Sequence, residues 1–107
     1  SQISLARYIL DRLAGLGIDC IFGVPGDYDL VFLDEILAHP SVRWIGCVNE
    51  LNAAYAADGW ARATGLPGVL CTVFGVGELS SINGVAGSFA ESIPIIHIVG
   101  KPSTAVQ

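Results

Sequence analysis

The chain has 107 residues, of which 52% are apolar and only 14% are charged. A chain of this length provides one domain at most, and its high apolar fraction excludes a disordered polypeptide. Ten acidic residues against five basic ones give a net charge of −5 without a basic run, which argues against nucleic acid or an anionic membrane as a partner.

Helix and strand patterns alternate along the chain. Four segments carry apolar residues at helical spacing, and short apolar runs typical of buried strands separate them. In chain order, the predicted elements are a helix over 5–16, a strand over 19–23, a helix over 30–37, a strand over 42–48, a helix over 49–65, a strand over 69–73, a helix over 79–89 and a strand over 93–99. Ser4 and Asn49 can cap the first and third helices, and Leu79, Ile82 and Phe89 carry the helical spacing of the fourth.

This alternation predicts an α/β fold of three layers, α/β/α, around a mostly parallel sheet, because strands joined through helices form right-handed βαβ units. The strands are continuously apolar, as expected where helices cover both faces of a sheet. In open sheets of this kind, ligands bind beyond the carboxyl ends of the strands. That rule selects three segments, 23–27, 48–50 and 72–77, which follow strands and carry glycine, carboxylate or capping residues.

The three cysteines, Cys20, Cys47 and Cys71, lie far apart in apolar stretches and form no Cys-x-x-Cys pair. They are typical of buried thiols in a reducing compartment, so we expect a cytoplasmic protein. We expect no signal peptide, because the first residues lack a basic segment. The longest apolar stretch, 95–99, is far shorter than the roughly 20 residues of a membrane helix.

The Gly75-Val76-Gly77 turn is similar to part of a dinucleotide-binding fingerprint. That fingerprint requires a third glycine where this chain has Ser80, and an acidic residue at the end of the next strand, where this chain has Val99-Gly100-Lys101. A tight strand-to-helix turn is therefore the favoured interpretation. Its glycines expose backbone for the close approach of a ligand.

Glu50 follows the capping Asn49 and lies at the carboxyl end of a predicted buried strand. The simplest interpretation is a carboxylate that complements the dipole of the helix that it begins. The apolar strand before it and the alanine-rich helix after it indicate instead that solvent is scarce around this side chain. A carboxylate in such surroundings is suited to sharing a proton with a ligand nitrogen.

The other acidic and histidine candidates are more ambiguous. Asp27 follows a Pro-Gly pair and serves equally well as a turn residue, a helix cap or a functional acid, while Asp29 could cap the same helix. His97 lies in an apolar strand and is interpreted as a core histidine with a hydrogen-bond partner, and His39 is interpreted as a loop residue. No His, Cys, Asp and Glu cluster has the spacing of metal ligands, so we expect no metal to be bound by this segment alone.

Three long stretches stand in the order and at the spacing of one enzyme family. They are Phe22-Gly23-Val24-Pro25-Gly26-Asp27, the stretch that runs from Asn49-Glu50-Leu51-Asn52 to Ala61-Arg62, and Phe74-Gly75-Val76-Gly77-Glu78-Leu79-Ser80. Together they resemble the thiamine-diphosphate-dependent 2-oxo acid decarboxylases, in particular the pyruvate and indolepyruvate (or phenylpyruvate) decarboxylase group. The chain resembles acetolactate synthases less, because those enzymes usually carry Glu-Gln where it has Glu50-Leu51.

The resemblance implies the N-terminal pyrimidine-binding domain of the thiamine-diphosphate-binding fold. Glu50 matches the family glutamate that hydrogen-bonds a ring nitrogen of the cofactor's aminopyrimidine and thereby favours the tautomer that activates the thiazolium carbon. Asp27 matches the family's catalytic aspartate, which relays protons to and from the bound intermediate. The weaker matches are loop positions near the pyrimidine: Pro25, Gly26, Thr72, Gly75 and Val76.

The resemblance also implies that residues 1–107 are an incomplete segment of a longer enzyme. The family's His-His pair, its middle domain and its diphosphate-binding domain, which binds Mg²⁺, are not in this sequence. Each active site of the family forms between two subunits, so a homodimer or homotetramer is expected. We expect the segment alone to be inactive towards a 2-oxo acid, and poorly soluble because its sheet ends in an uncovered edge.

Two other functions stay open from the residues alone. In a non-catalytic remnant of this fold, Glu50 would survive only as a charge at a helix end. In a dinucleotide-binding module, which the missing third glycine disfavours, the Gly75-Val76-Gly77 turn would approach the ligand. The choice among pyruvate, indolepyruvate, phenylpyruvate and branched 2-oxo acids depends largely on residues outside the segment, so the sequence does not rank these substrates.

Overall fold

The computed structural model describes residues 2–106, so Ser1 and Gln107 lie outside the described residues. In chain order its elements are α1 (Leu5–Gly15), β1 (Cys20–Gly23), α2 (Leu30–Ala38), β2 (Arg43–Gly46), α3 (Glu50–Thr64), β3 (Gly68–Val73), α4 (Val76–Ser80), α5 (Ile82–Ala90), β4 (Ile95–Gly100) and a 3₁₀ turn, η1 (Thr104–Val106). The predicted order of helices and strands is confirmed, with β2 shorter than predicted and the fourth helix divided in two. Over residues 2–106, no helix has the length and apolar character needed to cross a bilayer.

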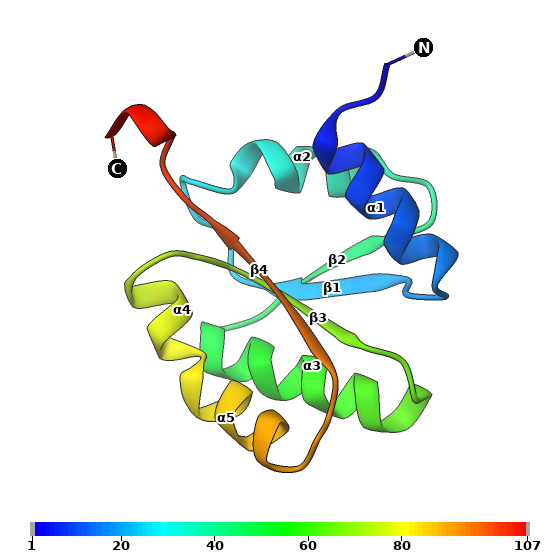
Figure 1. Ribbon diagram of the computed structural model, residues 1–107, viewed down its shortest axis with the longest axis vertical. Helices are drawn as coiled ribbons and strands as arrows, with labels where there is room; N and C mark the ends of the chain where they lie inside the picture. Colours follow the sequence, from blue (N-terminus) through cyan, green and yellow to red (C-terminus); the bar gives the residue numbers. More distant parts are fainter. Residues whose placement is uncertain (1, 107) are drawn as a thin grey trace.

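The four strands form one sheet in which all neighbours are parallel, in the order β2-β1-β3-β4. Helices α1 and α2 cover one face of the sheet, and α3, α4 and α5 lie on the other (Figure 1). The predicted three-layer α/β/α fold is therefore confirmed. The strand order reverses between β1 and β3, which makes their carboxyl ends the switch point where open α/β sheets bind ligands.

The two faces of the sheet bury different side chains. The core towards α1 and α2 is built from large apolar residues: Leu10, Leu13, Ile18, Ile21, Leu33, Ile36, Val42, Val69 and Cys71. The core towards α3 is built from smaller ones: Ala53, Ala54, Ala57 and Leu70. Successive residues of β3 point to opposite faces, which places Val69 and Cys71 in the first core and Leu70 in the second.

Alanine and glycine bring α3 close to both the sheet and α5. A Cβ added to Gly68 of β3 would overlap the carbonyl oxygen of Ala57 in α3. A Cβ added to Gly84 of α5 would lie 2.6 Å from the Cβ of Ala54. Glycine is therefore required at both positions by the close approach of the neighbouring helix.

The fourth helical segment differs from the prediction in continuity and in the face that it buries. The apolar residues at helical spacing are not buried: Leu79 is 66% exposed, Ile82 46% and Phe89 85%. Its buried residues are all small: Gly77, Ser81, Gly84 and Ser88. Small residues face inwards because the alanine surface of α3 lies too close for larger side chains. The segment divides at Ser81, whose hydroxyl donates to the carbonyl of Glu78 at 2.6 Å.

The expectation that every strand is buried on both faces holds only in the centre of the sheet. β1 and β3 are almost completely buried, whereas all six residues of the edge strand β4 are half-buried. The other edge strand, β2, has exposed residues at both ends. Edge strands lack a neighbour on one side, so an apolar run does not guarantee burial there.

Both predicted helix caps are confirmed. Oγ of Ser4 accepts from the N–H of Arg7 at 3.0 Å, and Oδ1 of Asn49 accepts from the N–H of Asn52 at 2.9 Å. The left-handed Gly65, with a φ of +75°, ends α3. Caps therefore fix where α1 and α3 begin, and the second of them sets the position of Glu50.

The cysteines are free thiols, as predicted, but their burial differs. Cys20 and Cys71 are buried and Cys47 is half-buried. Burial raises the pKa of Cys20 to about 11 and that of Cys71 to about 12. Both thiols stay protonated at neutral pH and act as small apolar side chains or as weak hydrogen-bond donors.

The interpretation of His39 as a simple loop residue is incomplete, because its ring joins two helices. The side chain is only 3% exposed, and its Nδ1 accepts from the N–H of Ser41 at 3.1 Å. Nε2 therefore carries the proton and donates to Oδ1 of Asp11 in α1 at 2.8 Å. This hydrogen bond and a second one from Arg7 hold the pKa of Asp11 below its usual range.

Candidate functional site at the carboxyl ends of the strands

The three segments that the sequence selects meet at the carboxyl ends of the strands. The loop after β1 packs against the end of β3, because a Cβ added to Gly26 would overlap the side chain of Val73. The turn after β3 packs against the start of α3, because a Cβ added to Gly77 would lie 3.4 Å from Oε2 of Glu50. Backbone turns and a carboxylate are thereby gathered at the switch point between β1 and β3.

Glu50 is held at this edge by the residues before it. The N–H of Cys47 donates to the carbonyl of Gly23 at 2.9 Å, which ties the connection from β2 to the end of β1. Asn49 caps α3, so the Glu50 carboxylate is not needed for that purpose. The residue is half-buried, and the expected scarcity of solvent around it is therefore found only in part.

Gly75 and Gly77 form the turn that lies against Glu50. Gly75 has a φ of +70°, which residues with a side chain rarely adopt. Gly77 is buried, and a Cβ there would lie 2.8 Å from a methyl group of Val73. Between them, Val76 is 81% exposed. At Gly77 the turn thus presents backbone without a side chain next to the Glu50 carboxylate.

Thr72 and His97 pair across the strands β3 and β4. Oγ1 of Thr72 lies 2.9 Å from Nε2 of His97, and the threonine is completely buried. Burial lowers the pKa of His97, and the charge of Glu78 raises it by less. The predicted hydrogen-bond partner of His97 is confirmed, but its predicted place in the core is wrong, because the residue is half-buried on the edge strand β4. The Thr72 hydroxyl is engaged in this bond and the residue has no exposed surface, so its role near a cofactor stays a prediction.

The loop after β1 exposes Asp27 and buries Asp29. Asp27 and Pro25 are exposed, and Gly26 is half-buried. Asp29 is only 3% exposed and occupies the N-cap position of α2, but its side chain makes no capping hydrogen bond. The carboxylate turns back towards the loop, where Oδ1 accepts from the N–H of Gly26 at 2.9 Å.

Asp29 also contacts β3, whereas its place in the sequence predicts only a helix cap. Its Oδ2 lies 3.7 Å from Sγ of Cys71. Burial raises the pKa of Asp29, while hydrogen bonds from Gly26 and Cys71 lower it by less. The signal that could have revealed this role is the three-residue spacing from Gly26, at which an Asp side chain can bond back to a turn.

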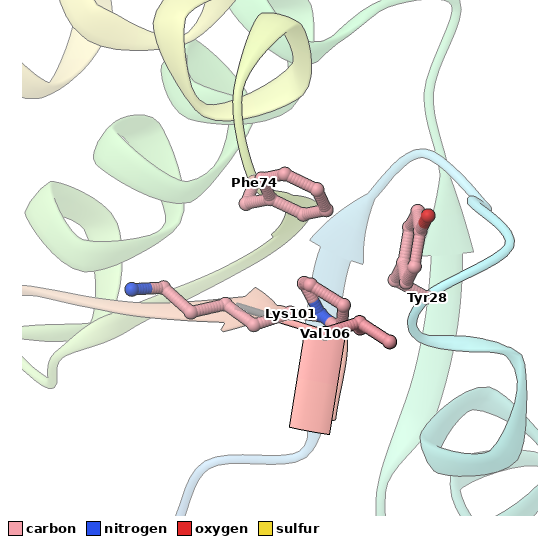
Figure 2. A pocket seen from close by; sticks show the side chains of 5 residues that line it. Tyr28, Phe74, Lys101 and Val106 are labelled. Atoms are coloured by element: carbon pink, nitrogen blue, oxygen red, sulfur yellow. The ribbon is translucent and has the colours of Figure 1, made fainter. Parts of the chain in front are cut away.

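A cavity of about 490 Å³ opens at the same end of the sheet. Its lining comes from the segments that follow β1, β3 and β4: Tyr28, Phe74, Lys101, Pro102 and Val106. The rings of Tyr28 and Phe74 meet edge to face, with their centroids 5.0 Å apart. Figure 2 shows both rings beside the cavity. Phe74 lies in the segment 72–77 that the sequence selected, but none of the residues predicted to bind the cofactor or to act on the substrate lines the cavity.

The fold and this edge define a known class of protein. Residues 3–107 match the family described as thiamine pyrophosphate enzyme, N-terminal TPP binding domain, and the chain belongs to that family. It is 62% identical to the alpha-keto-acid decarboxylase of Mycobacterium ulcerans (strain Agy99) and 63% identical to that of Mycobacterium avium (strain 104), each over 104 residues. The alpha-keto-acid decarboxylase of Mycobacterium tuberculosis is 61% identical over the same length.

These matches cover 97% of the chain and 18% of each of the three relatives. The chain therefore spans about a fifth of the length of the curated relatives that it matches. The resemblance on which the sequence reasoning relied, to decarboxylases that use thiamine diphosphate, is confirmed at the level of the family.

The residues at this edge fit the pyrimidine ring of thiamine diphosphate. A planar heterocycle needs a hydrogen-bonding group at its nitrogen and backbone that it can approach closely. Glu50 offers the hydrogen-bonding group. The turn with Gly75 and Gly77 offers the accessible backbone, because a Cβ on Gly77 would fill space next to Oε2 of Glu50. For the part of the chain from residue 2 to 106, no three His, Cys, Asp or Glu side chains gather as metal ligands.

Proposed function

We propose that this chain is the pyrimidine-binding segment of a longer carboxy-lyase that uses thiamine diphosphate to convert a 2-oxo acid into an aldehyde and carbon dioxide. The observation that carries the proposal is the position of Glu50, whose carboxylate lies next to Gly77 at the switch point of the sheet. The likeness to alpha-keto-acid decarboxylases supports the substrate class. The substrates proposed are 2-oxo acids of the pyruvate, indolepyruvate or phenylpyruvate type.

In the proposed site, the carboxyl group of Glu50 shares a proton with a ring nitrogen of the pyrimidine. Hydrogen bonds that involve a charged group are stronger than neutral ones, and the half-buried position of Glu50 reduces competition from water. The chemistry that thiamine diphosphate supplies when bound is an electron sink for the decarboxylation. The residues that would contact the ring are Pro25, Gly26, Gly75 and Val76, whereas Thr72, which has no exposed surface, is proposed only as a residue close to the ring.

Asp27 is the proposed acid and base for the substrate. It is exposed on the loop after β1, at the same edge of the sheet as Glu50. A carboxyl group that a substrate can reach is able to take up and return protons during the reaction. Glu50 and Asp27 thereby have separate roles, the first at the cofactor and the second at the substrate.

The outer surface of α4 and α5 supports assembly with further subunits. Leu79, Ile82 and Phe89 are exposed on these neighbouring helices, and contiguous exposed apolar surface commonly marks an interface. We propose a homodimer or homotetramer in which another subunit covers this surface. Ligands outside this segment would bind the Mg²⁺ ion, and the free thiols support a cytoplasmic location.

Substitution of Glu50 in the full-length protein tests the proposed function. Glu50→Gln should lower kcat for 2-oxo acid decarboxylation by about 10²-fold or more, because the carboxylate that controls the proton at the pyrimidine is lost. Glu35→Gln is the matched control, since Glu35 lies in α2 and accepts only a 3.3 Å hydrogen bond from Ser4 that glutamine can also accept. This control should retain the wild-type rate.

Binding separates the proposed function from its alternatives. A titration of the full-length protein should show affinity for thiamine diphosphate with Mg²⁺ and none for NAD. Full activity in Glu50→Gln would refute the proposed role of Glu50. It would indicate that this residue serves only as a charge at the end of a helix. Binding of NAD alone would favour a dinucleotide-binding module.

A further inference from the structure

We propose that Asp29 is a positioning residue whose buried carboxylate clamps the loop that carries Asp27. The clamp itself depends only on the contacts of the loop. Its expected effect on catalysis rests on the proposed function. Asp29 is the one acidic residue among residues 2–106 that is buried. Burying a carboxylate is unfavourable unless it receives hydrogen bonds, so its partners indicate its role.

Two hydrogen bonds of opposite direction join Asp29 to Gly26. The N–H of Gly26 donates to Oδ1 of Asp29 at 2.9 Å, and the N–H of Asp29 donates to the carbonyl of Gly26 at 3.1 Å. The ring that these two bonds close has Asp27 and Tyr28 at its central positions. The Asp29 carboxylate therefore fixes the backbone that presents the proposed acid and base.

The other carboxylate oxygen anchors this turn to the sheet. Cys71 of β3 donates its thiol proton to Oδ2 across 3.7 Å. Gly100, at the end of β4, packs against Asp29, because a Cβ added to Gly100 would lie 2.9 Å from the Cβ of Asp29. A single side chain thus connects the loop after β1 with the ends of β3 and β4.

The capping of α2 does not account for this geometry. An Asp at an N-cap position usually accepts a hydrogen bond from the first turn of its helix, and Asp29 makes none. Its carboxylate turns to Gly26 instead. Tyr28, the other central residue of the turn, contacts Phe74 edge to face, so the clamp also holds one wall of the cavity in Figure 2.

Amide hydrogen exchange on the full-length protein tests the clamp without reference to activity. Asp29→Ala should accelerate exchange in the peptide that covers residues 24–29 by about tenfold or more, because Gly26 loses its acceptor. Asp29→Asn should preserve the protection, since an amide oxygen can still accept from Gly26. Asp34→Ala removes an exposed acid of α2 and, as the matched control, should leave this exchange unchanged.

Kinetics measure the consequence for the proposed reaction. In Asp29→Ala, kcat should fall about tenfold, because Asp27 is no longer held in place, while the affinity for thiamine diphosphate and the KM for the 2-oxo acid stay within about threefold. Asp29→Asn should restore most of kcat. Here kcat is referred to the concentration of sites that bind thiamine diphosphate, because a smaller folded fraction would also lower the rate without changing KM. A merely structural role would leave this kcat per site unchanged.

The possible results decide between these roles. Unchanged exchange in a folded Asp29→Ala protein would overturn the clamp, and so would an equal loss of protection in Asp29→Asn. If the alanine variant does not fold, the asparagine variant decides alone, with retained protection in support and lost protection against. A wild-type protein without decarboxylase activity would refute the proposed function, yet the exchange comparison would still decide on the clamp.

Discussion

Helices α1 and α2 cover one face of the sheet and α3 covers the other (Figure 1). The first face buries large aliphatic side chains, whereas the second buries Leu70 against the alanines of α3. The first face resembles the core of a self-contained domain. On the second, close helix packing leaves large apolar side chains of α4 and α5 on the outside and places Glu50 against a glycine turn. The comparison indicates that the α1 and α2 side carries most of the large buried side chains, while the other side positions Glu50 and leaves an exposed apolar surface.

Leucines on the two sides should respond very differently to truncation. Leu10→Ala, at a residue with no exposed surface, should lower the free energy of unfolding by about 2–5 kcal/mol. In the monomeric domain, where no partner subunit covers it, Leu79 is 66% exposed, and Leu79→Ala should change this free energy by less than about 0.5 kcal/mol. Denaturant titration measures both changes, and equal losses would refute the division between the two sides.

Two glycines of α5 test how tightly the alanine side is packed. Gly84→Ala should destabilise the domain by about 1–3 kcal/mol, because the new Cβ would lie 2.6 Å from that of Ala54. Gly87→Ala is the matched control in the same helix, with no atom within 4 Å of the new Cβ. It should stabilise the domain by about 0.5–1 kcal/mol. A gain in stability from both substitutions would show that α5 packs against α3 more loosely than the approach of Gly84 to Ala54 requires.

Two aspartates on opposite sides of the sheet should give opposite dependences on pH. Burial raises the pKa of Asp29 above its usual value of 3.8. As pH rises, Asp29 therefore loses its proton earlier in the unfolded chain than in the folded protein. Its contribution to stability is present below the unfolded-state pKa and is lost as pH rises through the folded-state pKa. Asp29→Asn should therefore gain stability relative to the wild type as pH increases above about 4. The measurement is denaturant titration between acidic and neutral pH, and a constant difference would contradict the prediction.

Asp58, in α3, should behave in the reverse way. Hydrogen bonds from Arg62 and Ser88 lower its pKa, and the latter bond, 2.6 Å long, joins α3 to α5. Its contribution is present above the unfolded-state pKa and is lost as pH falls through the lowered folded-state pKa. Asp58→Asn should thus be less stable than the wild type at neutral pH, and this deficit should shrink in acid. If the loss of stability in Asp58→Asn relative to the wild type grows in acid, this prediction is contradicted.

The order of elements and the parallel sheet could be predicted, because alternating apolar runs and caps such as Ser4 and Asn49 are local signals. The buried face of α4 and α5 could not, since helical spacing identifies Leu79, Ile82 and Phe89 as a set without showing how close α3 lies. The role of Asp29 depends on contacts with Cys71 and Gly100, which are far away in sequence. Local patterns thus indicate which segments meet, whereas the partners of a buried side chain require the fold.

The most direct test of Glu50 compares two ligands in calorimetric titrations of the full-length protein. One is thiamine diphosphate, and the other is an analogue that carries C–H in place of the pyrimidine ring nitrogen proposed to face Glu50. We predict that the wild type prefers the cofactor by about tenfold or more, and that Glu50→Ala removes this preference while still binding both ligands. Equal affinity of the wild-type protein for the two ligands would contradict the proposed hydrogen bond.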